Sequence, residues 1–471
     1  MKRLLLILSL VVSLLPLTVT RVMAGEVDIL VQKLVDKNIL SPSEAQIVLD
    51  DTKLQVSKDL AQAKSLSVPD WTQRIKWGGD VRFRTQGDWG KNNTRNIGND
   101  GLNDQRIRNR IRGRFWMEGK VNDFTYSGVR FAGGATGARS TNDTLDDYFS
   151  KDYVMFDQYY TRFEAPREVI RDYGKYFNDA KLWVGRFPIP FNYSEMVWDS
   201  DINPTGLAAQ YVSPDLKLSG LPSVNLYSNG GMFWLTESQL YNNDPMLWAM
   251  QGGVKTDVFG PFASTVDLST AIYNFANILH RNPTGSANTN TRVLSSDDAG
   301  LGTAAATGYR FEYNVLDLLV SVDNSKVMDI EFPHGFYADY IKNLSCHNND
   351  LDNGVLVGAY IGKKKIKNPG DWKARAEWRY IERDAIPDFM PDSDFYGFGT
   401  YTNFTNGNIN AGNNGLPAEG GTNGKGINLA FEYQLFKNTA LNIEYYWMKP
   451  IKSLDRTAPW NELQVDLTTK F

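Results

Sequence analysis

Five arginines spaced two residues apart form the most concentrated run of charge in this 471-residue chain. They are Arg106, Arg108, Arg110, Arg112 and Arg114. Side chains at this spacing share one face of a β-strand, and at about 3.4 Å per residue the row covers roughly 27 Å. The residues between them, from Ile107 to Phe115, are mostly apolar and share the opposite face. A row of guanidinium groups of this length could order polar solutes and favour anions.

The arginine row needs polar surroundings. One Arg facing lipid at mid-depth costs about 2–4 kcal/mol, and five such penalties would rival the net stability of a domain. Residues 372–380 and 441–447 show the same separation of charged from apolar side chains. In the first of these segments, Lys373, Arg375 and Arg379 alternate with aromatic and small residues. We therefore expect the charged faces to line the lumen of a barrel, which must be wet or rich in carboxylates.

Carboxylates that could face the arginines follow the fifth expected strand, at Glu195, Asp199 and Asp201. If this segment folds into the lumen, the two signs of charge create a transverse field at a constriction. The alternative is that lumen salt bridges hold the arginines and only stiffen the wall. Arg186, at the end of that fifth strand, is also expected to line the pore.

Segments of alternating polarity recur from Trp71 to the last residue. They predict an all-β transmembrane β-barrel of about 16 antiparallel strands, with a range of about 14–18. A barrel of this size is wide enough for an aqueous channel. The expected strands are 75–87, 105–119, 123–132, 153–163, 180–187, 206–213, 223–236, 247–258, 263–275, 308–320, 333–343, 354–365, 371–383, 426–436, 439–449 and 461–471.

The lengths of the connections support the barrel. Connections after odd-numbered strands are mostly long and rich in Asn, Gly and Asp, as at 384–425, whereas several after even-numbered strands are short, as at 437–438. Two connections, 164–179 and 321–332, depart from this rule. Long outer loops and short periplasmic turns are typical of outer-membrane barrels, and a soluble β-sandwich gives no reason for the asymmetry.

Both ends of the chain fit export to a membrane. Residues 1–24 combine basic residues, an apolar run and a small-residue cleavage site ending at Ala24, which predicts a cleaved signal peptide. The last strand, Asn461–Phe471, has an apolar face that ends in a terminal aromatic residue and is expected to pair with the first strand. The sequence thus places the barrel at 71–471, in the outer membrane of a Gram-negative bacterium.

Residues 25–70 are expected to form a separate helical segment. Ser41-Pro42-Ser43-Glu44 reads as a capping box at the start of a second helix, with Pro at the first helical position. The segment is predicted to lie in the periplasm. It could serve as a small cap or plug, or as a coiled coil that helps a trimer assemble, and the short heptads leave both open.

Composition narrows the class further. The full chain carries a net charge of −4, and removal of residues 1–24, with three basic and no acidic residues, makes it −7. An acidic chain argues against nucleic acid as a partner. Cys346 is the only cysteine, so no intrachain disulfide forms, and Cys346-His347 is too sparse for a metal site. Aromatic residues make up 13%, which suits the girdles of a barrel.

Several stretches resemble the putative porin family of Gram-negative bacteria. They include residues 182–186 (L-W-V-G-R), 198–206 (W-D-S-D-I-N-P-T-G) and 378–395 (W-R-Y-I-E-R-D-A-I-P-D-F-M-P-D-S-D-F). With the helical segment and Phe471, the resemblance covers nearly the whole mature chain. It implies a barrel that acts as a diffusion channel for small polar solutes or ions, as a homotrimer in outer-membrane lipid. It implies no particular substrate and no cofactor.

Two other functions remain open at this level. An outer-membrane hydrolase would need a triad built from His280, His334 or His347, but no G-x-S-x-G frames a nucleophile, so no catalytic residue is assigned. A barrel could instead serve as a scaffold or sheath for a redox partner, although the chain has no C-x-x-C-H motif for a haem of its own. The Asn- and Gly-rich loop 396–425 could be a lid, a surface epitope or slack chain.

Overall fold

The computed structural model describes much of residues 31–51 and most of 70–471. Apart from single positions and pairs, the gaps are 52–69, 91–103, 218–222, 238–242, 280–290, 294–306, 347–350, 396–420 and 452–458. The expected signal peptide, His280, His347 and most of the loop 396–425 lie outside the described residues. Residues 1–74 and 75–471 form two separate units.

The first unit contains the capping box. The Ser41 backbone N–H donates to Glu44 Oε2 at 2.9 Å, and the Glu44 N–H donates to Ser41 Oγ at 3.3 Å. These two bonds satisfy backbone donors that a helix start leaves free. A single helical turn, α4 (Asp70–Gln73), ends this unit.

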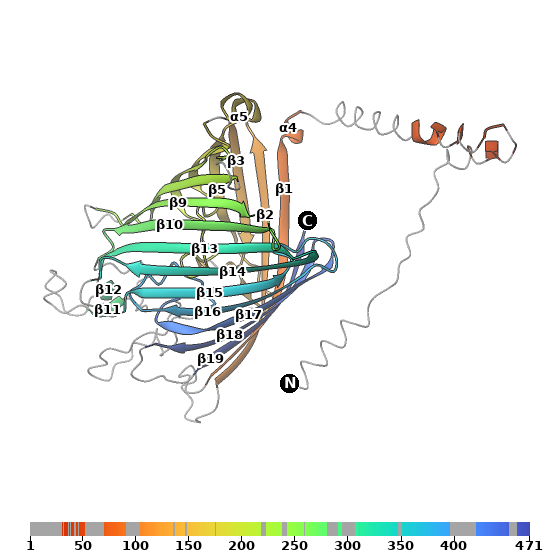
Figure 1. Ribbon diagram of the computed structural model, residues 1–471. Coiled ribbons are helices and arrows are strands. Elements are labelled where there is room, and N and C mark those ends of the chain that lie inside the picture. The colour runs from red at the N-terminus through yellow and green to blue at the C-terminus, as the bar shows by residue number, and fades with distance from the viewer. Residues whose placement is uncertain are drawn as a thin grey trace. The chain divides into compact units, whose positions relative to one another are not determined.

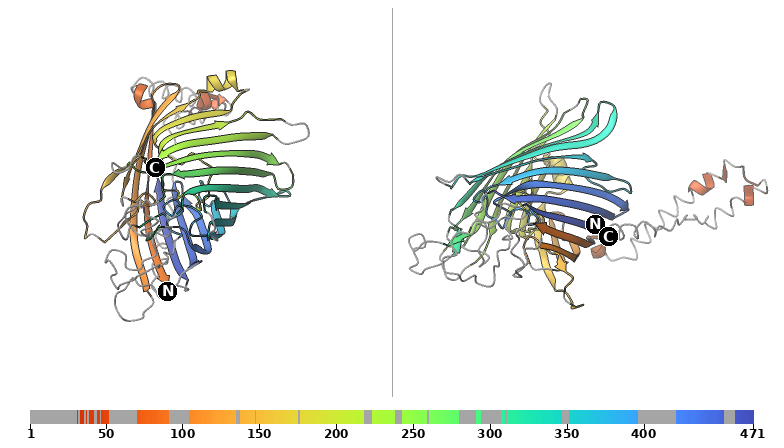
Figure 2. Two further views of the ribbon diagram at one scale, coloured as in Figure 1. Left: turned by 90° about the vertical axis from the view of Figure 1, so that its left-hand side faces the viewer. Right: turned by 90° about the horizontal axis from the view of Figure 1, so that it is seen from below.

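The second unit is a closed antiparallel barrel of sixteen long strands, which confirms the predicted fold class and strand number (Figures 1 and 2). The strands are β1 (Ile75–Gly90), β2 (Asp104–Lys120), β3 (Thr125–Gly133), β5 (Val154–Glu164), β6 (Asp179–Arg186), β7 (Thr205–Val212), β8 (Val224–Trp234), β9 (Met246–Val258), β10 (Ser264–Ala276), β13 (Tyr313–Val327), β14 (Ile330–Asn343), β15 (Asn353–Gly362), β16 (Trp372–Ile381), β17 (Gly424–Phe436), β18 (Thr439–Pro450) and β19 (Trp460–Lys470). Three short strands, β4 (Asp143–Thr144), β11 (Thr291–Val293) and β12 (Thr307–Tyr309), lie in the connections.

The barrel closes where the last strand meets the first. β19 pairs with β1 from Asp80–Lys470 to Gly90–Trp460. Beyond this ladder, the N–H groups of Gly79 and Phe471 each donate to the other residue's carbonyl at 3.0 Å. The predicted pairing of the terminal strand with the first strand is therefore confirmed.

The difference in length between the connections at the two ends of the barrel is clearer than the sequence suggested. β13 begins at Tyr313 and continues to Val327, so only residues 328–329 join it to β14. The expected 12-residue gap at 321–332 was wrong, because the mostly polar residues 321–326 continue the strand. The other exception, after β5, carries the helix α5 (Arg167–Tyr173). We call the end with connections 121–124, 259–263, 328–329, 363–371 and 437–438 the short-turn end.

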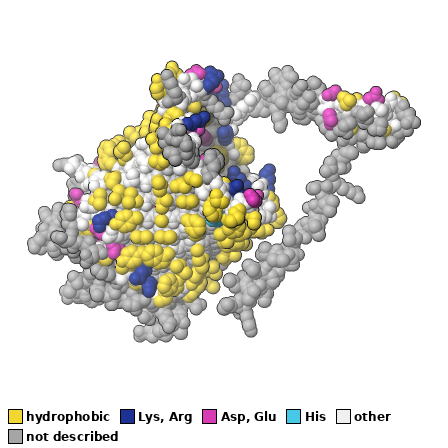
Figure 3. Space-filling view, in the orientation of Figure 1, with side chains coloured by type: hydrophobic (Ala, Val, Ile, Leu, Met, Phe, Trp, Pro, Cys, Tyr) yellow, Lys and Arg dark blue, Asp and Glu magenta, His cyan; other side chains and the backbone are white. Residues whose placement is uncertain are grey.

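Alternation along each strand gives the barrel an apolar outer surface. Large side chains such as Phe83, Leu182, Trp248, Leu318 and Trp378 are exposed on this surface. Figure 3 shows apolar side chains covering most of the visible wall. This apolar outer face of the strands is suited to contact with lipid. No described helix is long and apolar enough to span a bilayer.

Part of the lumen is filled by an apolar core rather than by water. Segment 187–204, which follows β6, folds inward and buries Met196 and Trp198 among the lumen-facing side chains of β8–β10. Segment 382–395, which follows β16, adds Ile386 and Phe395 to the same buried cluster. The sequence did not predict this core, because it assigned a wet, charged lumen to the whole barrel.

Candidate functional site: a charged constriction inside the barrel

The arginine row lies on the inner face of β2, beside charged residues of β1 and β19. The register sets Arg110 opposite Arg84, Arg112 opposite Arg82 and Arg114 opposite Asp80. Arg84 and Arg82 in turn lie beside Asp466 of β19, to which Arg84 donates hydrogen bonds of 2.7 and 2.8 Å. Period-two alternation on three neighbouring strands thus builds one continuous wall.

The described arginines of this wall are compensated by neighbouring groups. Arg112 and Arg114 pair with Asp80 at 3.2 and 2.9 Å. Arg108 Nε lies 3.9 Å from a carboxylate oxygen of Asp88, and Arg110 donates to the Asn142 carbonyl at 3.0 Å. Arg106 is part of β2, but its side chain lies outside the described residues. The wall is a network of salt bridges and hydrogen bonds rather than a row of free cations.

The acidic segment 187–204 joins this wall to the opposite side. Asp201 Oδ1 lies 3.4 Å from both Arg112 and Arg114. Glu195 reaches β16 instead, where its Oε2 lies 2.9 Å from Arg379 and 3.8 Å from Arg375. Segment 187–204 therefore connects the arginines of β2 with the arginines of β16 through ion pairs.

Asp199 has a structural position and contacts no arginine at ion-pair distance among the described residues. It accepts the backbone N–H groups of Asp201 at 2.8 Å and Ser393 at 2.9 Å. Its own N–H donates to the Met390 carbonyl at 2.7 Å. Burial raises the pKa of Asp199 to about 7. Asp199 ties the two inward segments together, which differs from the expected role as a counter-charge to the arginine wall.

On β16, Arg379 is completely buried among three carboxylates. It lies 2.8 Å from Glu377, 2.9 Å from Glu195 and 2.7 Å from Asp392. Arg375 pairs with Glu377 and Glu444, both at 2.7 Å, and Lys373 with Glu432 at 3.2 Å. All three predicted cations of this strand lie on its inner face.

Arg186 does not face the lumen. The register pairs Gly185 with Tyr160 and Trp183 with Arg162, and the side chains of Tyr160, Trp183 and Arg162 face inward. Arg186 is one residue out of phase, pairs with Tyr159 and donates to Thr205 Oγ1 at 2.9 Å on the outer face. The expectation that Arg186 lines the pore was wrong. Neighbouring residues of a strand face opposite sides of the sheet, so a residue next to an inward-facing one lies on the outer face.

The second inward segment, 382–395, is the part of the site that sequence reasoning missed. Asp392 pairs with Arg379, and Asp394 Oδ2 lies 3.2 Å from Arg84 on the other wall. Arg139, in the connection after β3, donates to the carbonyls of Asp388 and Pro391 at 2.8 and 3.2 Å. The signal present in the sequence was the close spacing of Asp388, Asp392 and Asp394 next to two prolines.

Three adjoining cavities lined by described residues lie in the lumen. The largest of these three, about 1040 Å³, opens at the short-turn end and is lined in part by turn 363–371. A second, about 460 Å³, lies between segment 187–204 and strands β13–β16. The third, about 140 Å³, lies between the two inward segments and the arginine wall. Arg82, Arg112, Asn442 and Asp466 line both the largest and the smallest cavity, so the lumen narrows from one into the other.

A closed barrel with an apolar exterior, and with a charged lumen narrowed by inward segments, defines a membrane protein of the outer-membrane β-barrel class. The chain belongs to the putative porin family, whose family model matches residues 45–312 and 303–471. The resemblance drawn from the sequence is therefore confirmed.

Several solved outer-membrane proteins are similar in structure. OprB of Pseudomonas putida is 10% identical, with 85% of this chain and 95% of that chain covered and a TM-score of 0.48. OmpT of Vibrio cholerae is 11% identical, with coverage of 84% and 97% and a TM-score of 0.40. A variant of the Rh. blastica porin is also 11% identical, with coverage of 84% and 100% and a TM-score of 0.40. No curated protein sequence matches the chain.

Proposed function

We propose that the protein is a water-filled diffusion channel for small polar solutes or ions in the bacterial outer membrane. The observation that carries this proposal is the polar passage beside the apolar core, which narrows from about 1040 Å³ to about 140 Å³ between charged walls. Side chains do not fill this part of the lumen, so hydrated solutes can enter it. The function needs no catalytic residue or cofactor.

Single-channel recording in planar bilayers tests the proposal. Purified protein should produce discrete conductance steps in KCl, and closure in groups of three would support the proposed homotrimer. Absence of any conductance from correctly folded protein would overturn the channel function. It would favour the scaffold alternative, for which co-purification with a redox partner is the test.

We further propose a preference for anions. The largest cavity is lined by eight Lys or Arg residues and three Asp or Glu residues, so its field attracts anions. The reversal potential across a KCl gradient measures this preference. Replacing Arg108, Arg110 and Arg112 by Ser should lower it. Clear cation selectivity that this substitution leaves unchanged would contradict the proposal.

A further inference from the structure

The turn between β15 and β16 concentrates lysines at the short-turn end. Residues 363–367 read K-K-K-I-K. Lys363 pairs with Glu331 and Lys364 with Asp323. Lys365 and Lys367 are exposed, and neither makes an ion pair with a described carboxylate. Two of the four lysines therefore keep uncompensated charge, although they belong to the same turn as the paired ones.

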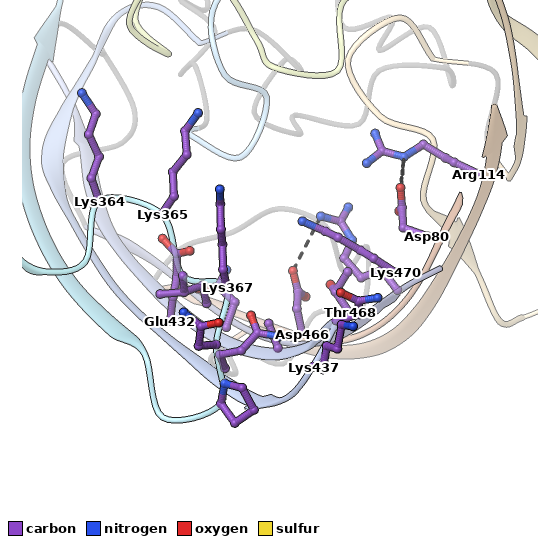
Figure 4. A pocket seen from close by; sticks show the side chains of 18 of the residues that line it. Asp80, Arg114, Lys364, Lys365, Lys367, Glu432, Lys437, Asp466, Thr468 and Lys470 are labelled. Carbon is purple, nitrogen blue, oxygen red and sulfur yellow. Dashed lines mark hydrogen bonds and ion pairs between the residues drawn. The ribbon is translucent and has the colours of Figure 1, made fainter. Parts of the chain in front are cut away.

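Two more lysines face this turn across the largest cavity. Lys437, in the turn between β17 and β18, and Lys470, at the end of β19, line the same cavity. Both are exposed and form no ion pair with a described carboxylate. Figure 4 shows Lys365 and Lys367 extending into the opening, with Lys437 and Lys470 across from them. We call Lys365, Lys367, Lys437 and Lys470 the lysine mouth.

The acidic residues of the cavity do not neutralise the lysine mouth, because each is paired elsewhere. Asp80 lies 2.9 Å from Arg114, and Glu432 lies 3.2 Å from Lys373. Asp466 makes its short bonds to Arg84, outside the cavity lining. The four lysines therefore supply most of the cavity's excess of positive charge.

We infer that the lysine mouth binds small anions carrying two or more negative charges, of the kind presented by phosphorylated or polycarboxylate solutes. This inference rests on the proposed channel function and names the solute class of that channel. Coulomb energy scales with the charge of the ion, so four ammonium groups favour a divalent anion over chloride. Lysine suits this task because its ammonium is a mobile point charge that needs no fixed geometry.

The shape of the lumen gives this binding a consequence for transport. The lysine mouth surrounds about 1040 Å³, whereas the adjoining cavity at the constriction holds about 140 Å³. An anion held in the wide part must pass the narrow part to leave on the other side. A strongly attracted anion should therefore occupy the passage and reduce the chloride current through it.

The test uses the full-length protein in planar bilayers at about 0.1 M KCl, with inorganic pyrophosphate or citrate added to each side in turn. Both anions should reduce the chloride current, and at lower concentration from the side of the lysine mouth. The double variant Lys365→Gln/Lys367→Gln should raise the half-blocking concentration roughly tenfold, because two of four charges at the site are lost. Raising KCl to about 1 M should abolish block, since the Debye length falls to about 3 Å.

Lys363→Gln is the matched control, because it removes a lysine from the same turn that is paired and does not line the cavity. It should leave block unchanged. Block by pyrophosphate alone would identify phosphate-bearing solutes, block by citrate alone would identify polycarboxylates, and block by both would show that charge is sufficient. Equal block in the double variant and the parent would overturn the inference, as would conductance without block. A protein that folds but never conducts would instead overturn the channel function.

Discussion

Arg379 holds three parts of the barrel together, and its replacement by Ala should destabilise the protein strongly. The guanidinium is fully buried and contacts Glu377 on its own strand, Glu195 on the first inward segment and Asp392 on the second. Removing one partner of a buried ion pair costs about 3–5 kcal/mol, because the remaining charge has no compensation. Arg375 still lies 2.7 Å from Glu377 and continues to compensate its charge. The carboxylates that lose their compensating charge are therefore mainly Glu195 and Asp392.

Equilibrium unfolding of the purified barrel in urea, followed by tryptophan fluorescence, measures this effect. Arg171→Ala provides the control, because Arg171 is paired with Asp172 but its side chain is 75% exposed. An exposed pair of this kind is worth less than about 1 kcal/mol. The triple variant Arg379→Met/Glu195→Gln/Asp392→Asn removes the charges together and should recover much of the loss.

The same substitution should change the channel. Replacing Arg379 removes the ion pairs that hold Glu195 and Asp392, and with them the two inward segments, against β16. The constriction should therefore widen, and single-channel conductance should increase. A destabilisation by Arg379→Ala no larger than that of Arg171→Ala would refute the reasoning. So would a triple variant that is less stable than the single variant, because uncompensated charge would then not be the cause.

Three further predictions concern single contacts. Asp201→Asn removes a charge beside Arg112 and should raise the chloride-to-potassium permeability ratio about sevenfold, because a charge at roughly 7 Å in water changes the energy of each ion by about 0.6 kcal/mol in opposite directions; an unchanged reversal potential would contradict this. Burial raises the pKa of Asp199 to about 7, so its contribution to stability is present below about pH 4 and is lost as the pH rises through about 7. Asp199→Asn should therefore remove this pH dependence from thermal unfolding. Deleting Phe471 removes two hydrogen bonds to Gly79, so the folded fraction on heat-modifiability gels should fall while the conductance of assembled channels stays the same.

The barrel could be predicted from the sequence because its signals are local. Alternation with a period of two identifies each strand, and a short polar turn fixes the next one. The same local signals placed the arginines of β2 and β16 on inner faces. They failed for Arg186, which is the last residue of its strand and follows Gly185, whose φ is 120°. At such a position the sequence gives little indication of which face the side chain occupies.

The inward segments could not be predicted in this way, because their contacts are distant in sequence. The bond between Asp199 and Ser393 joins residues 194 positions apart. One clue was nevertheless present in β10, where Ala271, Ile272, Tyr273 and Phe275 are apolar on both faces. A strand that is apolar on both faces has no wet side, which indicates a filled lumen next to it.

The positions of arginine and lysine in this barrel follow from the cost of desolvation. An arginine placed deep in the wall loses water and must gain carboxylates or carbonyls in exchange, as Arg84, Arg112 and Arg379 do. These partners offset the positive charge of the arginine, so the arginine attracts a passing anion less strongly. A lysine at an open mouth keeps its water and needs no partner, so its charge stays effective. Selectivity should therefore depend more on Lys365 and Lys367 than on the longer and more conspicuous arginine row.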